Sequence, residues 1–468
     1  MAKGNTLVHA ERTDVGRRRS SNQDAMQVLP PASGSQYAQR GWLFVVADGM
    51  GAHAAGERAS AMAVERVPVI YEQIAPRSPP LAMRRALESV NQEIHATGNA
   101  SPELEGMGTT CTAVAILPRG ALIGHVGDSR AYRIRKGIIH QLTRDHSLVW
   151  ELEASAGMTA EQAAGAAPKN IITRSMGPHA AVDADLEGPH PVEDGDVYLL
   201  SSDGLTGQIA DEEIGLFAGT LDPKEAAEAL VGLTLIRGAP DNVTVLVVRA
   251  GPAEVSKVSA SDRPWILSDN ETASGRTQFS IPWVPLLIAA ACLFAGLALF
   301  SSAGAVGPHS APAVGGGGGL DSRLKMLGGT VLLFAAGILV LWSFLSGIAG
   351  KVRLERVLPP GKQVGKGPYR TSRCAPTREL VEGVVTSVES AADGLSTEAR
   401  KKAADWLAEA RNRMANIQGA NADEASGDVA KKAIQAVKQA IDLHRQAFER
   451  ARLDVTAVGS AEESTGRA

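Results

Sequence analysis

The feature that most constrains the fold is an apolar run that ends in one acid followed by glycines. Residues 42–46 read Trp-Leu-Phe-Val-Val, an unbroken apolar run that predicts a buried β-strand. Asp48 ends this run, and glycines follow at positions 49, 51 and 56. An isolated buried carboxylate is costly unless a cation compensates it. Either a metal ion or a buried arginine could provide this positive charge, so it matters whether further acids lie close to Asp48.

Composition excludes several classes of protein. The formal net charge of -4 gives no polybasic footprint for nucleic acid. The three cysteines, at positions 111, 292 and 374, lie too far apart to indicate a disulfide framework or a zinc site, and a reducing compartment is expected. Residues 1–6 lack the apolar core of a secretory signal, so we expect the N-terminal region to stay in the cytoplasm.

Residues 6–250 have the pattern of one domain that mixes strands and helices. The predicted helices come in pairs between groups of strands, instead of one after each strand. That order favours an α+β fold of antiparallel sheets with helices outside over a doubly wound parallel sheet. Residues 251–282 are rich in Ser, Asp, Thr, Pro and Gly, and we interpret them as a linker.

Two apolar stretches without charge, 283–301 and 326–350, flank a Gly-rich loop at 302–325. A bilayer core takes about 20 apolar helical residues, so the stretches predict two transmembrane helices in contact with membrane lipid. A buried helix of a second soluble domain is the alternative for the first stretch. Basic residues follow the second stretch, so the positive-inside rule predicts a multi-pass protein of the cytoplasmic (inner) membrane, with both ends facing the cytoplasm.

The C-terminal part begins with a basic Pro/Gly linker at 351–376. Residues 377–455 are rich in Ala, Glu, Lys and Arg, and their apolar residues keep a helical spacing. We therefore expect an α-helical tail of two or three amphipathic helices. A surface bundle without chemistry is the simpler interpretation, and a partner-binding or self-associating coiled coil is the alternative.

Four more acids lie where predicted strands end or turns begin: Asp24, Asp128, Asp203 and Asp241. Taken singly, each is explained as an ordinary turn residue. Taken together with Asp48 they form a pattern, because Asp48 and Asp203 each end an apolar run and precede Gly. Carboxylates gathered at sheet ends, with no paired Lys or His, suit hard cations such as Mg2+ or Mn2+. The absence of Cys and His clusters disfavours softer metals.

Seven short motifs occur in a fixed order along residues 6–250. They are Thr13-Asp14-Val15-Gly16, Arg19-Ser20-Ser21-Asn22-Gln23-Asp24, Ala47-Asp48-Gly49-Met50-Gly51, Gly108-Thr109-Thr110, Gly127-Asp128-Ser129-Arg130, Ser202-Asp203-Gly204 and Asp241-Asn242-Val243-Thr244. The set resembles the bacterial branch of the metal-dependent serine/threonine protein phosphatases, type 2C. The resemblance implies a four-layer α-β-β-α sandwich, two antiparallel sheets flanked by helices, with a two-metal centre at one edge.

The resemblance also implies a set of metal ligands. Asp48 would bridge two metal ions, and Asp203 and Asp241 would complete the shell of one of them. The carbonyl oxygen of Gly49 would bind the other ion. Asp128, together with Asp203, would help to hold a third, weaker ion. The implied cofactors are two or three Mn2+ or Mg2+ ions.

Two further residues take catalytic roles by the same resemblance. Asp24 would hold a metal-bound water molecule by a hydrogen bond, and Arg19 would bind the substrate phosphate. Such chemistry needs no protein nucleophile, because two metals can activate water and clamp the phosphoryl group. The sequence departs from the family at Gln23, where many relatives have Glu, and at Met50, where animal members have a histidine. His53 lies further on, so protonation of the leaving group has no assigned residue.

The leading hypothesis is a membrane-anchored enzyme that hydrolyses phosphoserine and phosphothreonine on proteins by two-metal activation of water. A partner Ser/Thr kinase follows by family analogy. The alternatives are a catalytically weak module that senses phosphoproteins and a membrane scaffold that acts through its helical tail.

Overall fold

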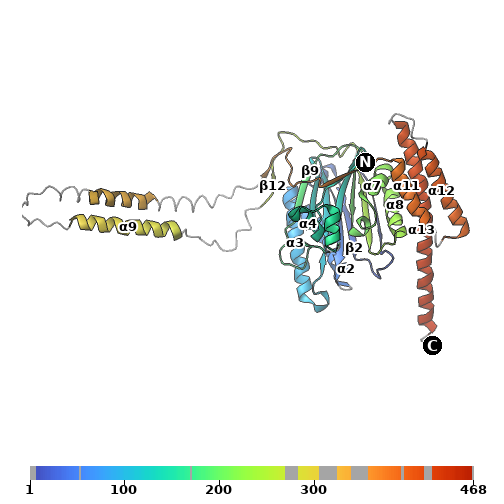
Figure 1. Ribbon diagram of the computed structural model, residues 1–468, viewed down its shortest axis with the longest axis horizontal. Coiled ribbons are helices and arrows are strands. Elements are labelled where there is room, and N and C mark those ends of the chain that lie inside the picture. The colour runs from blue at the N-terminus through green and yellow to red at the C-terminus, as the bar shows by residue number, and fades with distance from the viewer. Residues whose placement is uncertain are drawn as a thin grey trace, which may run out of the picture. The chain divides into compact units, whose positions relative to one another are not determined.

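The computed structural model describes residues 7–51, 54–168, 171–268, 283–304, 324–338, 357–391, 395–415 and 424–465. The chain divides into two compact units, residues 1–267 with 357–468, and residues 268–356. The larger unit contains two antiparallel sheets that pack face to face (Figure 1). Chain segments from both ends of the sequence therefore belong to one unit.

One sheet has the strand order β1-β11-β10-β7-β8-β14. Its strands are β1 (Val8–Asp14), β11 (Val243–Arg249), β10 (Val197–Ser201), β7 (Arg130–Arg135), β8 (Ile138–Gln141) and β14 (Arg370–Arg373). The other sheet has the order β2-β3-β5-β6-β9, with β4 paired to β3. Its strands are β2 (Asp24–Leu29), β3 (Trp42–Met50), β4 (Gly108–Thr109), β5 (Cys111–Leu117), β6 (Gly120–Val126) and β9 (Asp185–His190). A separate pair joins β12 (Trp265–Ile266) to β13 (Val357–Leu358).

The apolar run that opened the sequence analysis forms β3. Its side chains alternate, with Leu43 and Val45 in the core beneath the helices and Phe44 and Val46 in the core between the sheets. Both faces of the strand are therefore buried, which explains why its sequence is apolar without a break.

Helices cover the outer faces of both sheets. Helices α2 (Ala54–Ile74) and α3 (Pro79–Ala100) share a hydrophobic core with β3 and β5. Helices α7 (Asp211–Thr220) and α8 (Pro223–Ile236) share another with β10 and β11. Shorter helices are α1 (Gly34–Arg40), η1 (Pro102–Leu104), α4 (Leu148–Ala156), α5 (Ala160–Ala166) and α6 (Asp203–Thr206). The predicted fold, two antiparallel sheets flanked by helices, is confirmed.

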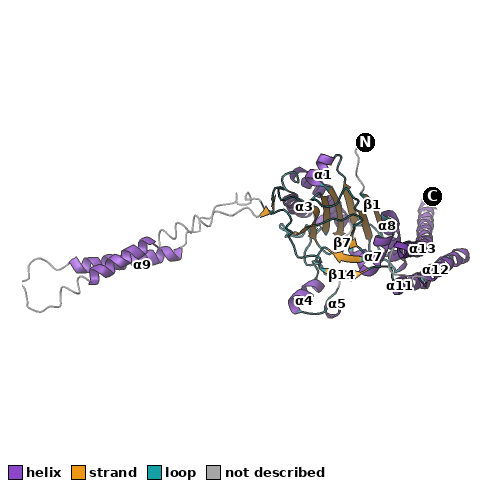
Figure 2. Ribbon diagram, turned by 90° about the horizontal axis from the view of Figure 1, so that it is seen from above, coloured by secondary structure: helices purple, strands orange, loops and turns teal. Residues whose placement is uncertain are grey.

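The predicted helical tail is also confirmed. It contains α11 (Arg378–Ser390), α12 (Thr397–Ala415) and α13 (Glu424–Thr465), which lie beside α7 and α8 (Figures 1 and 2). Leu407 and Ile441 from the tail enter the same hydrophobic cluster as Leu230 of α8. At Gly232 an added Cβ would lie 2.5 Å from Cγ2 of Ile441, so the glycine allows close packing of α8 against α13.

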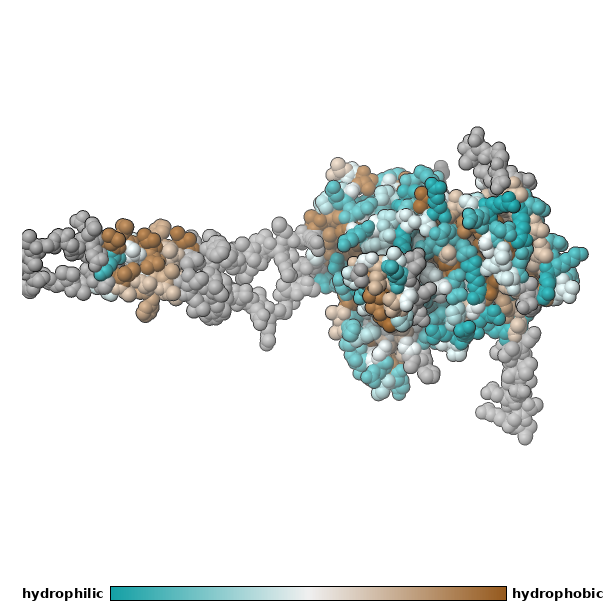
Figure 3. All heavy atoms as spheres, viewed as in Figure 1, coloured by the Kyte–Doolittle hydropathy of each residue, from teal (hydrophilic) through white to brown (hydrophobic). Residues whose placement is uncertain are grey.

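The smaller unit contains α9 (Trp283–Gly304) and a helix over 324–338. The two helices touch at Gly296, where an added Cβ would lie 3.1 Å from Cγ of Leu333. Their surface is largely apolar and exposes Phe294 and Leu297 (Figure 3).

The transmembrane predictions for 283–301 and 326–350 are not supported, and the multi-pass membrane location is wrong. Within the residues that the structure describes, no helix is long and apolar enough to cross a membrane. The second of these helices is described over residues 324–338 only. Its predicted continuation over 339–350 lies outside the described residues, as does most of the predicted loop, 305–323.

Candidate metal centre

The five acids singled out in the sequence lie at one end of the sandwich. Asp24 begins β2 and sits directly opposite Asp48 in the antiparallel register of β2 and β3. Asp203 follows β10, and Asp241 precedes β11, which is the neighbour of β10 in the other sheet. Asp128 lies in the turn between β6 and β7. Because the end of one antiparallel strand lies beside the start of the next, positions distant in sequence meet here.

Crowding of these carboxylates changes their proton affinity. Desolvation raises the pKa of Asp48 well above its usual value, and the charges of Asp24, Asp203, Asp128 and Asp241 raise it further. Desolvation likewise raises the pKa of Asp24 to about 7 and that of Asp128 to about 8. The pKa of Asp203 is raised by desolvation and by the charge of Asp241. Four carboxyl groups therefore lie where a positive charge would be favourable.

The arginines near these acids leave most of that charge uncompensated. Arg19 is half exposed and places Nη2 2.7 Å from Oδ2 of Asp241. Arg130 is hydrogen-bonded to Asp145, with Nε 3.0 Å from both carboxylate oxygens and Nη2 2.7 Å from Oδ2. Asp48 could be neutralised by a metal ion or by a buried arginine. Among the described residues, no buried arginine pairs with it.

The donor atoms present fit a hard divalent cation. Among the described residues, Oδ1 of Asp24 and Oδ1 of Asp128 are buried without a hydrogen-bond partner. Carboxylate oxygens are the ligands that Mg2+ and Mn2+ prefer. No three acid, His or Cys side chains in the described part of the chain already converge on a single point that could hold a metal ion. The acids therefore have the oxygen ligands and the location expected of a metal site. The ligand role of each acid stays a prediction.

Glycine is required beside two of these acids. At Gly49, an added Cβ would lie 2.1 Å from the carbonyl oxygen of Gly56 in α2, and the Gly49 amide donates to the Gln23 carbonyl at 3.0 Å. At Gly204, an added Cβ would lie 1.9 Å from the carbonyl oxygen of Asn242. The Asp-Gly pairs therefore reflect close backbone approach around the acids, besides turn formation. The role of the Gly49 carbonyl as a metal ligand stays a prediction.

Asn242 organises the loop that carries Arg19, a role that the sequence analysis missed. Its Nδ2 donates to the carbonyl oxygens of Val15 and Ser21, each at 2.9 Å, and its Oδ1 accepts from the Gln23 amide at 2.9 Å. Three bonds from one side chain join this loop to the start of β11. The sequence signal for this role was an Asn directly after the candidate ligand Asp241, because an Asn side chain both donates and accepts hydrogen bonds.

Three hydroxyl side chains support the acids from behind. Ser202 donates to Oδ2 of Asp24 at 2.7 Å. Oγ1 of Thr110 accepts from the Asp48 amide at 2.9 Å, and its hydroxyl is 2.7 Å from that of Ser129. These contacts fix the backbone of β3 and one face of the Asp24 carboxylate. The Gly108-Thr109-Thr110 motif was the sequence signal for this support, and its function had no assignment from the sequence.

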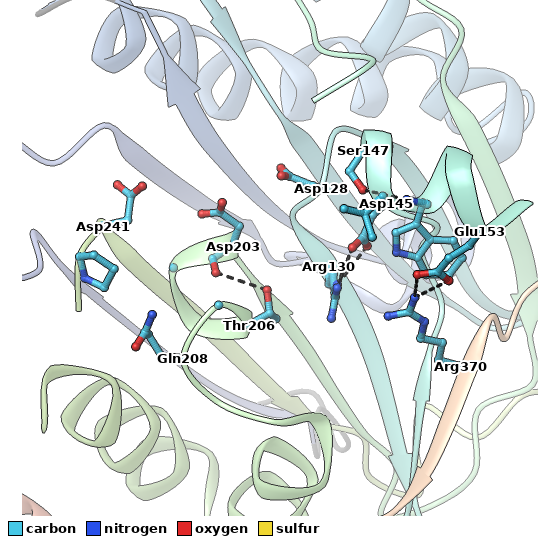
Figure 4. A pocket seen from close by; sticks show the side chains of 15 residues that line it. Asp128, Arg130, Asp145, Ser147, Glu153, Asp203, Thr206, Gln208, Asp241 and Arg370 are labelled. Atoms are coloured by element: carbon cyan, nitrogen blue, oxygen red, sulfur yellow. Dashed lines mark hydrogen bonds and ion pairs between the residues drawn. The ribbon is translucent and has the colours of Figure 1, made fainter. Parts of the chain in front are cut away.

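A pocket of about 470 Å³ opens beside the acids (Figure 4). Asp128, Asp203 and Asp241 line one part, and Glu153 and Arg370 line another. Arg370 comes from β14, more than a hundred residues beyond the predicted phosphatase domain.

Met50 ends β3, whereas Ala52 and His53 lie outside the described residues, so the leaving-group acid has no structural assignment.

Comparison with known proteins gives consistent matches for this part of the chain. A family model described as protein phosphatase 2C matches residues 15–230. A type 2C protein phosphatase of Streptococcus pyogenes is 37% identical over 245 residues, 51% of this chain and 95% of that protein. Protein phosphatase PhpP of Streptococcus pneumoniae is 38% identical over 240 residues, 50% of this chain and 94% of that protein.

A solved structure is also similar to this chain. It is the catalytic domain of the serine threonine protein phosphatase PstP in complex with two manganese ions, 34% identical, covering 52% of this chain and 98% of that one with a TM-score of 0.44. The curated relatives decide the family, because the chain spans nearly their whole length at more than 30% identity. The chain belongs to the protein phosphatase 2C family and is a metal-dependent protein-serine/threonine phosphatase.

Proposed function

We propose that the chain hydrolyses phosphoserine and phosphothreonine of proteins at the end of the sandwich where the five acids meet, with two or three Mn2+ or Mg2+ ions. The observation that carries this proposal is the convergence of the acids: Asp24 lies opposite Asp48 on paired strands, and Oδ1 of Asp24 and Oδ1 of Asp128 are buried without a hydrogen-bond partner among the described residues. Asp48, Asp203 and Asp241, with the carbonyl oxygen of Gly49, would hold two ions. Asp128 would hold a third with Asp203.

The bound ions would supply activated water and neutralise the phosphoryl oxygens. The chain's own residues would orient the reactants around them. Arg19 lies on an exposed loop and already contacts a carboxylate of the site, so its guanidinium can reach a phosphate there and bind two oxygens at once. Asp24 is held through Oδ2 by Ser202, which leaves Oδ1 to accept a hydrogen bond from water.

The substrates are phosphorylated proteins, and a cognate Ser/Thr kinase is the proposed source of those phosphates. The pocket is open to solvent and is lined by more acids than arginines, which suits metal ions better than a bare phosphate. Phosphate would therefore bind only after the ions are in place.

The test uses the full chain with p-nitrophenyl phosphate and a phosphothreonine peptide. We expect turnover of both with Mn2+, loss in EDTA, and recovery when Mn2+ is restored. Asp203→Asn should abolish turnover in a folded protein, whereas Asp405→Asn, an exposed acid on α12, should leave it unchanged. Binding of the phosphopeptide without turnover would instead support the sensing module, and metal-independent turnover would contradict the proposed chemistry.

A further inference from the structure

Residues 364–373, here called the strap, tie the two sheets together at one side of the sandwich. Val364 forms an isolated bridge with Gly188 at β9, the edge strand of one sheet. Six residues later the strap becomes β14 and pairs with β8 of the other sheet, from Arg370 opposite Gln141 to Arg373 opposite Ile138. A segment predicted as part of a linker therefore completes the edges of both sheets.

A buried carboxylate fixes the middle of the strap. Glu187 of β9 is 2% exposed. It accepts hydrogen bonds from the amides of Gly367 and Lys366, at 3.1 and 3.3 Å, and from the hydroxyl of Tyr369. At Gly365 an added Cβ would lie 1.8 Å from Oε2 of Glu187, so only glycine fits there. Displacing the strap would leave Glu187 buried without these donors, which is costly.

From this fixed position the strap contacts α4, a helix that lines part of the pocket. Nη2 of Arg370 lies 2.8 Å from each carboxylate oxygen of Glu153 on α4. Its guanidinium carbon also lies 4.3 Å from the ring centroid of Trp150, one turn earlier on α4. Trp150 in turn packs edge-on against Tyr369 of the strap, with centroids 6.0 Å apart. Figure 4 shows Arg370 and Glu153 at the side of the pocket away from Asp241.

The start of α4 is tied to the acid site by other contacts. Ser147 caps the helix, and the His146 amide donates to the Gly127 carbonyl at 2.7 Å, one residue before Asp128. Arg370 holds the same helix one to two turns further along, through Trp150 and Glu153. The ion pair also compensates Glu153, whose free charge at the pocket wall would repel an incoming phosphate.

We propose that Arg370 is a positioning residue for phosphoprotein substrates, because it holds α4 against the pocket and neutralises Glu153. This inference rests on the proposed function. A protein substrate is larger than the pocket and would contact α4, whose Trp150 and Glu153 line it, whereas a small aryl phosphate need not. Loss of Arg370 should therefore affect KM for phosphoproteins more than turnover of a small substrate.

The test compares Arg370→Ala with Arg373→Ala in the full chain with Mn2+. Arg373 is the matched control, because it lies on the same strand but is exposed. We expect Arg370→Ala to raise KM for a phosphothreonine peptide by about tenfold, in the range for coupled contacts, and to lower kcat/KM for p-nitrophenyl phosphate much less. Arg370→Lys should recover only part of the loss, since the lysine ammonium has no planar guanidinium to stack on Trp150. The charge swap Arg370→Glu with Glu153→Arg should recover activity relative to either single change.

Hydrogen exchange of the 148–156 segment gives a readout independent of catalysis. Exchange there should rise at least several-fold in Arg370→Ala and stay at the wild-type rate in Arg373→Ala. Equal KM values and equal exchange in both variants would overturn the inference while leaving the phosphatase assignment intact. A wild-type chain without metal-dependent turnover would contradict the proposed function, and the exchange comparison would still decide the role of Arg370 in holding α4.

Discussion

Two groups of acids in the larger unit differ in how their charge is met. Asp196 is 1% exposed, and its two carboxylate oxygens lie 2.6 Å from Nε and 2.5 Å from Nη2 of Arg135. Glu213 is met in the same way by two nitrogens of Arg237, at 2.6 and 2.7 Å. Where the five acids meet, Asp48 lies near other carboxylates instead, and Oδ1 of Asp128 has no partner among the described residues.

We infer that the difference separates acids that stabilise the fold from acids that are proposed to bind metal ions. A buried acid with a bidentate arginine is already compensated, so removing either partner leaves an unpaired charge. A crowded acid without a cation makes the metal-free fold less stable and gains from a bound ion.

The largest effect should come from Asp48. Asp48→Asn removes the acid that faces all the others, so we expect turnover of p-nitrophenyl phosphate with Mn2+ to fall by about a thousandfold, equivalent to several kcal/mol. The metal-free melting temperature should stay the same or rise, since one repelling charge is gone. Retained turnover, or a clear fall in melting temperature without metal, would show that Asp48 has a structural role.

Asp196→Asn should lower the stability of the fold and leave turnover unchanged. It leaves Arg135 without its principal buried partner, and we expect about 2–4 kcal/mol of lost stability in urea unfolding, discounted because Arg135 is partly exposed. Turnover per folded molecule should remain at the wild-type value. A variant as stable as Asp405→Asn would contradict the structural role of this pair.

Mn2+ should stabilise the fold of the wild type and should not stabilise that of Asp48→Asn. An ion that binds only the folded state adds about 2.7 kcal/mol at a hundredfold excess over its Kd. We therefore expect Mn2+ to raise the melting temperature of the wild type, EDTA to reverse the rise, and Asp48→Asn to show little of it. An equal rise in both proteins would place the ions elsewhere.

The smallest effect should come from Arg19, which lies at the edge of the site. Arg19→Ala should raise KM for the phosphopeptide by about tenfold, the value of one charge-assisted contact. Arg18→Ala, an exposed neighbour, is the matched control and should change nothing. A similar change in both variants would indicate general attraction by a basic loop instead of a specific phosphate contact.

The convergence of the acids could be predicted because it depends on local patterns. Asp48 and Asp203 stand at the ends of apolar runs, and antiparallel pairing brings such ends together. The contact of Arg370 with Glu153 could not, because it joins positions separated by 217 residues and depends on the strap crossing both sheet edges. No short-range pattern encodes such a contact.

The transmembrane prediction failed for a different reason. An uncharged apolar stretch suits a bilayer, but it also suits a helix packed on another helix. In the smaller unit, Gly296 of α9 allows close contact with Leu333, so part of the apolar surface is buried between the two helices. Hydropathy along the sequence does not distinguish these two environments.

Direct measurement of Mn2+ binding by calorimetry tests the central claim, that the uncompensated acids form a metal site. The metal-free full chain should bind at least two ions per molecule, and Asp405→Asn should match it. Asp48→Asn and Asp203→Asn should each lose most of that binding while keeping the fold. Undiminished Mn2+ binding by both variants would contradict the account.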